Sequence, residues 1–189
     1  MSKNTCPKSE VIEKFGMKHA GLSFSFQCNP ERCKNPAYFT EYLCFNALSD
    51  DKTGMSLTFV MCEYEGKAPT KIMGFISLKA TSLLYQNDEG QMEGYPALEI
   101  AELAVDQSCE GRGKGTDLLK YALVQCDFIR NDHAAVRYLV VCATEEAAGF
   151  YLKERPTVQF GRAEDRYVIP REIWNDSCIP LYLKLPEKV

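Results

Sequence analysis

Three glycines at alternate positions mark the stretch of this sequence whose chemistry can be read most directly. Gly111, Gly113 and Gly115 lie between an apolar run, Glu99 to Val105, and an amphipathic segment that begins near Thr116. Because glycine has no Cβ atom, the backbone N–H groups of such a turn can point outward, and a helix start adds the positive end of its dipole. The stretch predicts an anion site, most naturally for phosphate.

Two carboxylates stand in the apolar run before the turn. Burial would raise the pKa of Glu99 or Glu102 toward that of a useful general base. Their three-residue separation puts them on opposite faces of a regular strand, unless a bulge resets the phase. The simpler alternative for each is an exposed or salt-bridged strand carboxylate.

The sequence of this turn does not match either of two well-known phosphate-binding motifs. A P-loop needs Gly-Lys followed by Ser or Thr, but Gly113-Lys114 is followed by Gly115. The dinucleotide fingerprint needs G-x-G-x-x-G, whereas the order here is G-x-G-x-G-T. The turn is therefore a pyrophosphate turn of another kind.

The same residues resemble the GNAT superfamily of acetyl-CoA-dependent N-acetyltransferases. Its signature is Gln/Arg-x-x-Gly-x-Gly/Ala after a strand that ends in Leu-x-Val, and here Leu103-Ala104-Val105 precede the turn. Downstream, Ala147, Phe150 and Tyr151 match the family's Asn-x-x-Ala-x-x-Phe-Tyr helix. Two motifs in the right order make the resemblance specific over roughly residues 71–184.

The chain departs from the family pattern at three places. Glu110 stands where the family has Gln or Arg, and Thr144 stands where it has Asn, although its hydroxyl can cap the helix that follows. The Gly-aromatic pair that usually follows the tyrosine helix is missing after Tyr151. These departures affect the residues expected to bind the pyrophosphate and those expected to pack beside Tyr151.

The resemblance implies a role for each motif residue. Tyr151 stands where the family places the tyrosine that protonates the CoA thiolate, and the alternative is a tyrosine packed on the sheet. Glu99 has the spacing of the family's general base, four residues before Leu103, while Glu102 could instead bind the substrate cation. The residues implied for acetyl-CoA binding are Leu103, Ala104, Val105, Glu110, Gly111, Arg112, Gly113, Lys114, Gly115 and Thr116.

Strands and helices alternate along the chain in the manner of an α/β fold. We expect a helix that opens at Pro36 and ends by Gly54, a second helix at 116–130 and a third at the tyrosine motif. The expected strands are 21–27, 56–64, 71–78, 99–105, 136–143, 166–170 and 179–184, with a polar, acidic loop at 86–96. The resemblance implies a mixed, splayed central sheet flanked by helices, in a single domain over 1–189 with a motif-bearing core at about 71–184 and an N-terminal helical and loop part at 1–55.

Composition sets further expectations. The 189 residues carry a net charge of −4, so the bulk electrostatics recruit neither nucleic acid nor an anionic membrane. Nine cysteines, several of them inside apolar runs, are interpreted as small buried hydrophobes in a reducing compartment, and no His or Cys spacing suggests a metal. No apolar leader or membrane span is present in the letters, so we expect a cytoplasmic protein, with a homodimer left open.

The leading functional hypothesis is transfer of acetyl from acetyl-CoA directly to a primary amine of a small molecule or peptide. One alternative is a non-catalytic CoA-binding module. Another is a toxin-type GNAT that acetylates aminoacyl-tRNA under the control of an antitoxin partner, which segments 26–28, 74–78 and 103–106 resemble. The acidic balance argues against tRNA, because RNA binding draws on clustered Lys and Arg, although Arg155, Arg162, Arg166 and Arg171 could form a local patch.

Overall fold

The computed structural model describes residues 8–153, 158–163, 167–170 and 178–187. The chain falls into two compact units, one formed by Met1–Ser77 with Glu102–Tyr121 and the other by Leu78–Ala101 with Ala122–Val189. Two long strands, β3 (Ala68–Gln86) and β4 (Met92–Val105), and the helix α4 (Lys114–Asp132) each run from one unit into the other. That residues 1–189 form a single domain stays a prediction.

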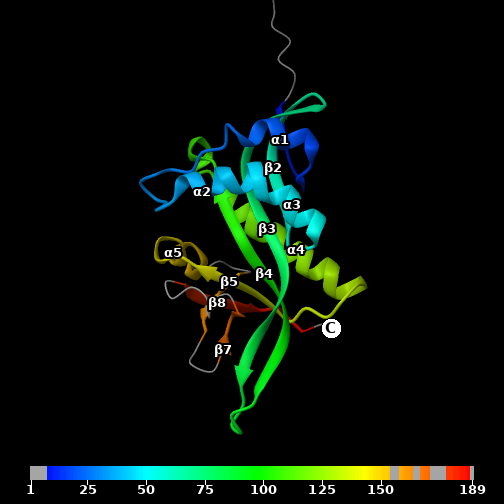
Figure 1. Ribbon diagram of the computed structural model, residues 1–189, viewed down its shortest axis with the longest axis vertical. Coiled ribbons are helices and arrows are strands. Elements are labelled where there is room, and N and C mark those ends of the chain that lie inside the picture. The colour runs from blue at the N-terminus through cyan, green and yellow to red at the C-terminus, as the bar shows by residue number, and fades with distance from the viewer. Residues whose placement is uncertain (1–7, 154–157, 164–166, 171–177, 188–189) are drawn as a thin grey trace, which may run out of the picture. The chain divides into compact units, whose positions relative to one another are not determined.

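The first unit combines one end of β3 and β4 with two further strands and the N-terminal helices. Its strands follow the order β1-β2-β3-β4, in which β1 is antiparallel to β2 from Lys8 opposite Glu65 to Lys14 opposite Phe59. The helices α1, α2 and α3 gather beside β2 (Figure 1). The bounds of its remaining elements are β1 (Lys8–Lys14), α1 (Met17–Ser23), α2 (Pro36–Glu41), the π-helical turn η1 (Tyr42–Asn46), α3 (Ala47–Thr53), β2 (Leu57–Glu65) and the 3-10 turn η2 (Gln107–Cys109).

The helix predicted to open at Pro36 is confirmed as the continuous run α2, η1 and α3. Asn35 caps it by accepting a hydrogen bond from the Tyr38 N–H at 3.4 Å, and Gly54 ends it in the left-handed region with φ 73°. The Tyr42 ring from this run stacks on Phe75 of β3, with centroids 5.9 Å apart. The run therefore covers the sheet of the first unit with an aromatic core.

The strand predicted at 21–27 is wrong, because α1 covers Met17–Ser23. The alternation that suggested a strand breaks down at Phe24, whose side chain is 68% exposed, while Phe26 is buried. His19 stabilises the helix instead: its Nδ1 accepts from the Gly16 N–H at 3.0 Å, and its Nε2 lies 3.1 Å from Glu13 Oε1. These contacts join residues only three and six positions apart, and they favour a helix over the strand that the period-two pattern predicted.

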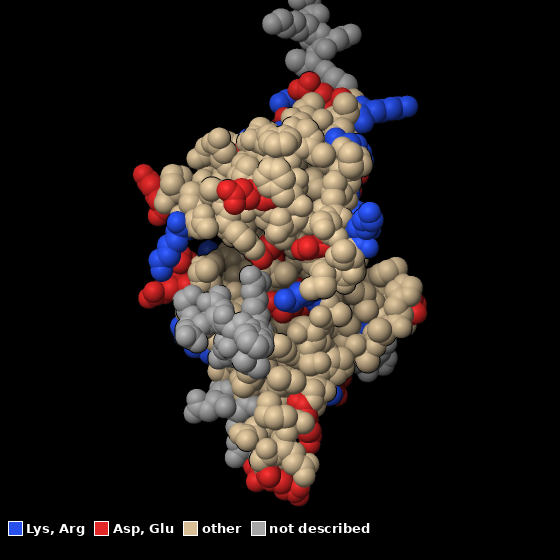
Figure 2. Space-filling view, viewed as in Figure 1, with Lys and Arg blue, Asp and Glu red and all other residues tan. Residues whose placement is uncertain are grey.

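The predicted acidic loop at 86–96 is also shorter than expected. β3 continues to Gln86 and β4 begins at Met92, so that a long hairpin replaces most of the loop. Asn87 closes the tip by accepting from the N–H groups of Glu89 and Gln91 at 3.1 and 2.9 Å. Figure 2 shows acidic atoms gathered at this tip.

The second unit contains a mixed sheet. The order within it is β3-β4-β5-β8-β6, with β7 on β3; β5 is parallel to β4 and antiparallel to β8 (Figure 1). The β4–β5 ladder covers only Ala97 to Ile100 opposite Tyr138 to Val141, as a splayed sheet requires. This confirms the predicted mixed, splayed α/β fold. The remaining bounds are β5 (Tyr138–Ala143), α5 (Glu145–Leu152), β6 (Gly161–Arg162), β7 (Tyr167–Val168) and β8 (Ile179–Lys184).

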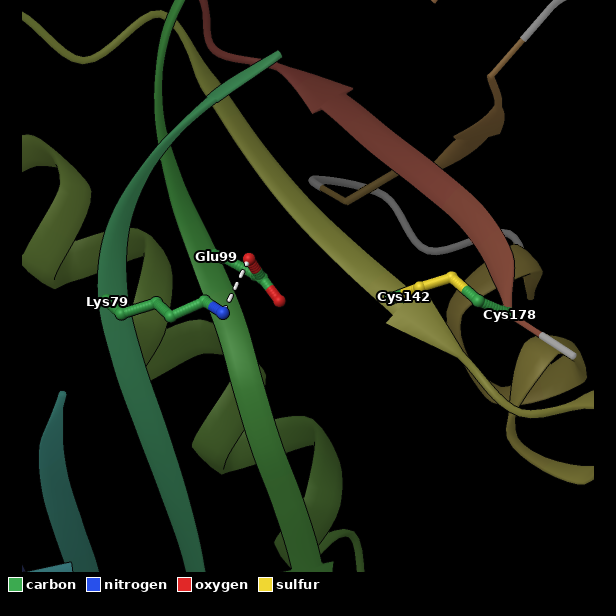
Figure 3. Close-up of a disulfide and its surroundings, with 4 residues drawn as sticks. All are labelled: Lys79, Glu99, Cys142 and Cys178. Atoms are coloured by element: carbon green, nitrogen blue, oxygen red, sulfur yellow. Dashed lines mark ion pairs between the residues drawn. A yellow bond between two sulfur atoms is a disulfide. The ribbon is translucent and has the colours of Figure 1, made fainter. Parts of the chain in front are cut away.

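Two of the cysteines form a disulfide, which corrects the expectation that all of them are reduced. Cys142 near the end of β5 is joined to Cys178, the residue before β8, with Cα atoms 5.3 Å apart (Figure 3). Their pairing gave no sequence signal, because they are separated by 36 positions in the chain and the antiparallel pairing of β5 and β8 brings them together. The free cysteines of the described residues are Cys28, Cys33, Cys44, Cys62, Cys109 and Cys126.

In the part of the chain that the structure describes, every helix is too short or too polar to cross a membrane. A cytoplasmic location stays a prediction.

Candidate active site

The glycine-rich turn lies in the first unit and has the backbone that an anion site needs. Gly111 and Gly113 have φ angles of +70° and +78°, a region that residues with a side chain rarely adopt. A Cβ atom built on either glycine would meet nothing within 4 Å, so the space beside the turn is open. α4 begins at Lys114, and the first N–H groups of a helix have no carbonyl partner four residues earlier. The turn therefore fits a pyrophosphate.

Asp106 fixes the entry to this turn and was missed in the sequence. Its carboxylate accepts from the Gln27 N–H at 3.2 Å and the Ser108 N–H at 3.1 Å, and it forms an ion pair with Lys71 at 2.9 Å. Burial alone would raise the pKa of Asp106, but the hydrogen bonds from Ser108, Lys71 and Gln27 outweigh it and lower the pKa. The signal that could have found it is Asp-x-Ser, the pattern of an Asx turn.

The side chains of the predicted turn residues bind mostly to the fold. Glu110 accepts from Asn29 Nδ2 at 3.2 Å and lies 3.5 Å from Arg32 Nη1. Lys114 forms an ion pair with Glu10 of β1, and only 13% of its side chain is exposed. The side chain of Arg112 is exposed. The backbone N–H groups of the turn, and not the side chains of Glu110 and Lys114, are therefore the main groups that can bind an anion.

The strand end before the turn carries Glu102 and the Leu103-Ala104-Val105 segment. Ala104 is buried, whereas Leu103 and Val105 are half-buried. Glu102 is half-buried too, and its Oε1 accepts from the Tyr38 hydroxyl of α2 at 2.8 Å. This hydrogen bond from α2 fixes the position of the Glu102 carboxylate, and nothing in the sequence indicated a contact between α2 and Glu102.

Glu99 differs sharply from Glu102 in its surroundings. It lies in the second unit, is 1% exposed, and its Oε2 is 3.2 Å from Lys79 Nζ of β3 (Figure 3). A carboxylate held in a buried position beside a cation has a fixed geometry, which a general base needs. Lys79 is a further residue of the candidate site that the sequence did not indicate.

Tyr151 lies in α5, also in the second unit, and is 5% exposed. Its ring packs edge-on against Phe150 and Phe160, with centroids 5.0 and 5.5 Å away. Thr144 is the N-cap residue of α5, but its side chain makes no capping hydrogen bond, so the predicted hydroxyl cap is wrong. The backbone carbonyl of Thr144 accepts from the N–H groups of Ala147 and Ala148 instead.

The predicted residues thus fall into two sets. The turn residues, Glu102 and Leu103-Ala104-Val105 belong to the first unit, and Glu99 and Tyr151 belong to the second. Among the described residues, no group of three or more His, Cys, Asp and Glu gathers as a metal site would.

The family model of the acetyltransferase (GNAT) family matches residues 23–155, which is more than half of the chain. The chain belongs to the acetyltransferase (GNAT) family. This confirms the prediction of an acyltransferase that uses acetyl-CoA. The family match by itself does not specify the acceptor of the acetyl group.

The chain is similar to one relative and to two solved structures that bear on its fold and its acceptor. The tRNA-acetylating toxin of Mycobacterium tuberculosis (strain ATCC 25618 / H37Rv) is 29% identical over 117 residues, which cover 59% of this chain and 68% of the toxin. A tyrosine-to-phenylalanine mutant of the AtaT toxin, bound to acetyl-CoA and the C-terminus of the antitoxin AtaR, matches with a TM-score of 0.64 and 17% identity over 93% of this chain and 92% of that one. AtaT complexed with acetyl-methionyl-tRNAfMet matches with a TM-score of 0.60 and 19% identity over 88% and 98%. At these identities the two structures show the fold alone.

Proposed function

We propose that this GNAT protein transfers the acetyl group of acetyl-CoA to the α-amino group of aminoacyl-tRNA. The observation that carries the proposal is the 29% identity, over more than half of the chain, to a tRNA-acetylating toxin. The similarity of fold to AtaT in complex with acetyl-methionyl-tRNAfMet supports the same acceptor. The comparisons therefore favour the alternative of the sequence analysis over its leading hypothesis of a small or peptide amine.

The proposed place for acetyl-CoA uses both ends of the strand–turn–helix segment. The open side of the turn at Gly111 and Gly113, with the first N–H groups of α4, would receive the pyrophosphate. The backbone of Leu103 to Val105, where β4 ends, would pair with the pantetheine arm. This mode of binding requires no charged side chain. It is consistent with the side-chain contacts of Glu110 with Asn29 and of Lys114 with Glu10.

The proposed chemistry is a direct transfer. An α-amino group has an ordinary pKa near 8, so most of the amine is protonated at neutral pH and has to lose a proton before the nitrogen can attack. The amine nitrogen attacks the thioester carbon, the C–S bond breaks, and the sulfur leaves with the bonding electron pair. In our proposal Glu99, held by Lys79, receives the proton of the amine directly or through water. The Tyr151 hydroxyl donates a proton to the departing sulfur.

We extend the proposal to a small partner protein that restrains the activity. AtaT has been captured with the C-terminus of its antitoxin, and this chain has the same fold. Of the four arginines that the sequence offered as an RNA-binding patch, Arg155, Arg166 and Arg171 lie outside the described residues. Only Arg162, on β6, is described, and it is exposed.

A transfer experiment tests the proposal. The protein is incubated with labelled acetyl-CoA and, in separate reactions, with aminoacyl-tRNA, deacylated tRNA and a library of small amines. We expect label on aminoacyl-tRNA that mild base releases, because base hydrolyses the ester between the amino acid and the tRNA. Label on the amine library and none on charged tRNA would overturn the proposal.

A further inference from the structure

A cavity of about 620 Å³ lies in the second unit, where β5 begins. The side chains that matter for its chemistry are Tyr95 of β4, Arg130 of α4, Arg137 before β5, Lys184 at the end of β8, and Glu187. This volume lies in the range of about 300–1,000 Å³ that is typical of sites for small ligands. None of these residues takes part in the acetyl transfer proposed above.

Backbone hydrogen bonds fix the frame of this cavity. The Arg137 N–H donates to the Pro96 carbonyl at 2.8 Å, and the Arg137 carbonyl accepts from the Leu185 N–H at 3.0 Å. The end of α4 is tied in by Arg130, whose Nη1 donates to the Pro186 carbonyl at 2.7 Å. Three elements that are distant in sequence therefore present their side chains from a fixed frame.

The charge of the cavity has the opposite sign to that of the chain. Three cationic side chains line it against one carboxylate, in a protein whose net charge is −4. Arg130 Nε is 3.1 Å from Asp127, so its charge is partly neutralised. Among the described residues, neither Arg137 nor Lys184 lies within ion-pair distance of a carboxylate. Glu187 attracts the Arg137 guanidinium electrostatically from beyond ion-pair distance, and neither Arg137 nor Lys184 is held in an ion pair with a described carboxylate that a bound anion would have to break.

Two tyrosine rings hold the Arg137 side chain in place. Its guanidinium carbon is 5.9 Å from the ring centroids of both Tyr95 and Tyr138. An arginine restrained by such cation–π contacts loses less freedom when it binds, and its planar fork matches the oxygens of a phosphate. The Tyr95 ring also gives the cavity an aromatic wall, on which a base can stack.

We propose that this cavity binds a backbone phosphate of RNA, with Arg137 and Lys184 as its cationic contacts. The inference rests on the proposed function, and it identifies where the tRNA substrate is held apart from its aminoacyl end. An RNA chain fits better than an acidic peptide, because phosphate takes the guanidinium fork and the ammonium together and a neighbouring base can use Tyr95. Phosphate could also come from a free nucleotide, so the experiment separates the two sources.

The test measures the binding of deacylated tRNA over a range of salt concentrations. Lys184→Gln removes an exposed charge at the end of β8, and Lys67→Gln removes a matched charge on the exposed turn between β2 and β3. We expect Lys184→Gln to weaken binding and to reduce the slope of log affinity against log salt by roughly 0.7–0.9, the value for one phosphate contact. Lys67→Gln should change neither quantity. An unchanged slope for Lys184→Gln overturns the proposal.

Arg137 provides a second variant that keeps the proposal falsifiable if one substitution disturbs the fold. Arg137→Gln should add a comparable loss of slope, and Arg137→Lys should restore the slope while leaving the affinity below that of the wild type, because an ammonium lacks the planar fork. Thermal melts identify a variant that fails to fold. Equal binding by all three Arg137 forms overturns the proposal.

Further measurements distinguish RNA from a free nucleotide as the source of the phosphate, and they test the cavity proposal separately from the proposed function. Adenosine monophosphate at millimolar concentration should compete weakly with tRNA, whereas tight nucleotide binding without tRNA binding would assign the cavity to a free nucleotide and overturn the RNA proposal. Displacement of tRNA from the wild type and Lys184→Gln alike by a poly-glutamate peptide would also overturn it. A wild type that acetylates charged tRNA, with variants of unchanged KM, overturns only the cavity proposal. A wild type that binds tRNA through Lys184 but acetylates no charged tRNA overturns the proposed function and supports the cavity as an RNA site.

Discussion

At the scale of single residues, Tyr151 carries the greatest consequence for the proposed chemistry. Its 5% exposure and its edge contacts with Phe150 and Phe160 suit a core tyrosine as well as a proton donor in a dry site. The two roles differ only in whether the hydroxyl is needed when charge develops on the sulfur. Removal of that one oxygen separates them.

We predict that Tyr151→Phe lowers kcat by ~10²–10⁴-fold, the usual value of general-acid assistance, and leaves the dissociation constant of acetyl-CoA unchanged. Steady-state kinetics with aminoacyl-tRNA and calorimetry with acetyl-CoA measure the two quantities. Tyr182→Phe is a matched control, because Tyr182 is a half-buried tyrosine of β8 in the same unit. An unchanged kcat for Tyr151→Phe would return the residue to a packing role.

Glu99 and Glu102 are separated by burial and by partner. Glu99 is 1% exposed and ion-paired with Lys79, whereas Glu102 is half-buried and accepts from Tyr38. We predict that Glu99→Gln lowers kcat by ~10²–10⁴-fold, the usual value of general-base assistance, while Glu102→Gln lowers kcat much less. A loss of kcat confined to Glu102→Gln would contradict the assignment.

Glu99→Gln also leaves Lys79 without its carboxylate, which lowers stability for a reason unrelated to catalysis. The double variant Lys79→Gln/Glu99→Gln removes this effect. We expect the double variant to regain stability in thermal melts and to stay as slow as Glu99→Gln.

At the scale of elements, the strand–turn–helix segment makes a prediction about acetyl-CoA binding. Gly113 has φ +78°, and a Cβ there would project into the open side of the turn. We predict that Gly113→Val removes measurable acetyl-CoA binding in calorimetry while the protein stays folded. Gly54→Val is a matched control, because Gly54 has φ +73° and open space around it but ends α3. Equal binding by the Gly113 variant and the wild type would move the site elsewhere.

The disulfide makes a prediction about the second unit. It joins β5 to the start of β8 across 36 residues, and a bond that closes a loop of this length stabilises a protein by roughly 3–4 kcal/mol. We predict that Cys142→Ser/Cys178→Ser lowers the denaturant midpoint, and that Cys33→Ser, at a half-buried free cysteine, changes it little. Midpoints that agree under oxidising and reducing conditions would show that the bond does not form in solution.

At the scale of the whole molecule, the sequence predicted the elements that are determined by residues close together in the chain. The turn, the helix after it, the helix from Pro36 and the β8 strand are encoded by neighbouring residues, and all of them are confirmed. The contacts that escaped prediction join distant residues, as Asp106 meets Gln27 and Glu99 meets Lys79. A single sequence specifies spacing along the chain but not which strands become neighbours.

Bulk charge and the comparisons favour different acceptors for a related reason. A net charge of −4 averages over the whole surface, including the acidic hairpin tip that Figure 2 shows. RNA binding depends on local fields, and the cavity beside Arg137 and Lys184 is cationic despite that average. The proposed acceptor therefore rests on the comparisons and not on composition.

The most direct test of the central claim is the ratio of kcat/KM for aminoacyl-tRNA to kcat/KM for the same amino acid as a free methyl ester. Both substrates carry the same α-amino group, so the ratio isolates what recognition of the tRNA contributes. We predict a kcat/KM at least 10³-fold higher for aminoacyl-tRNA, which is about 4 kcal/mol of additional transition-state stabilisation. Equal values for the two substrates, or a higher value for the free ester, would contradict the claim that charged tRNA is the acceptor.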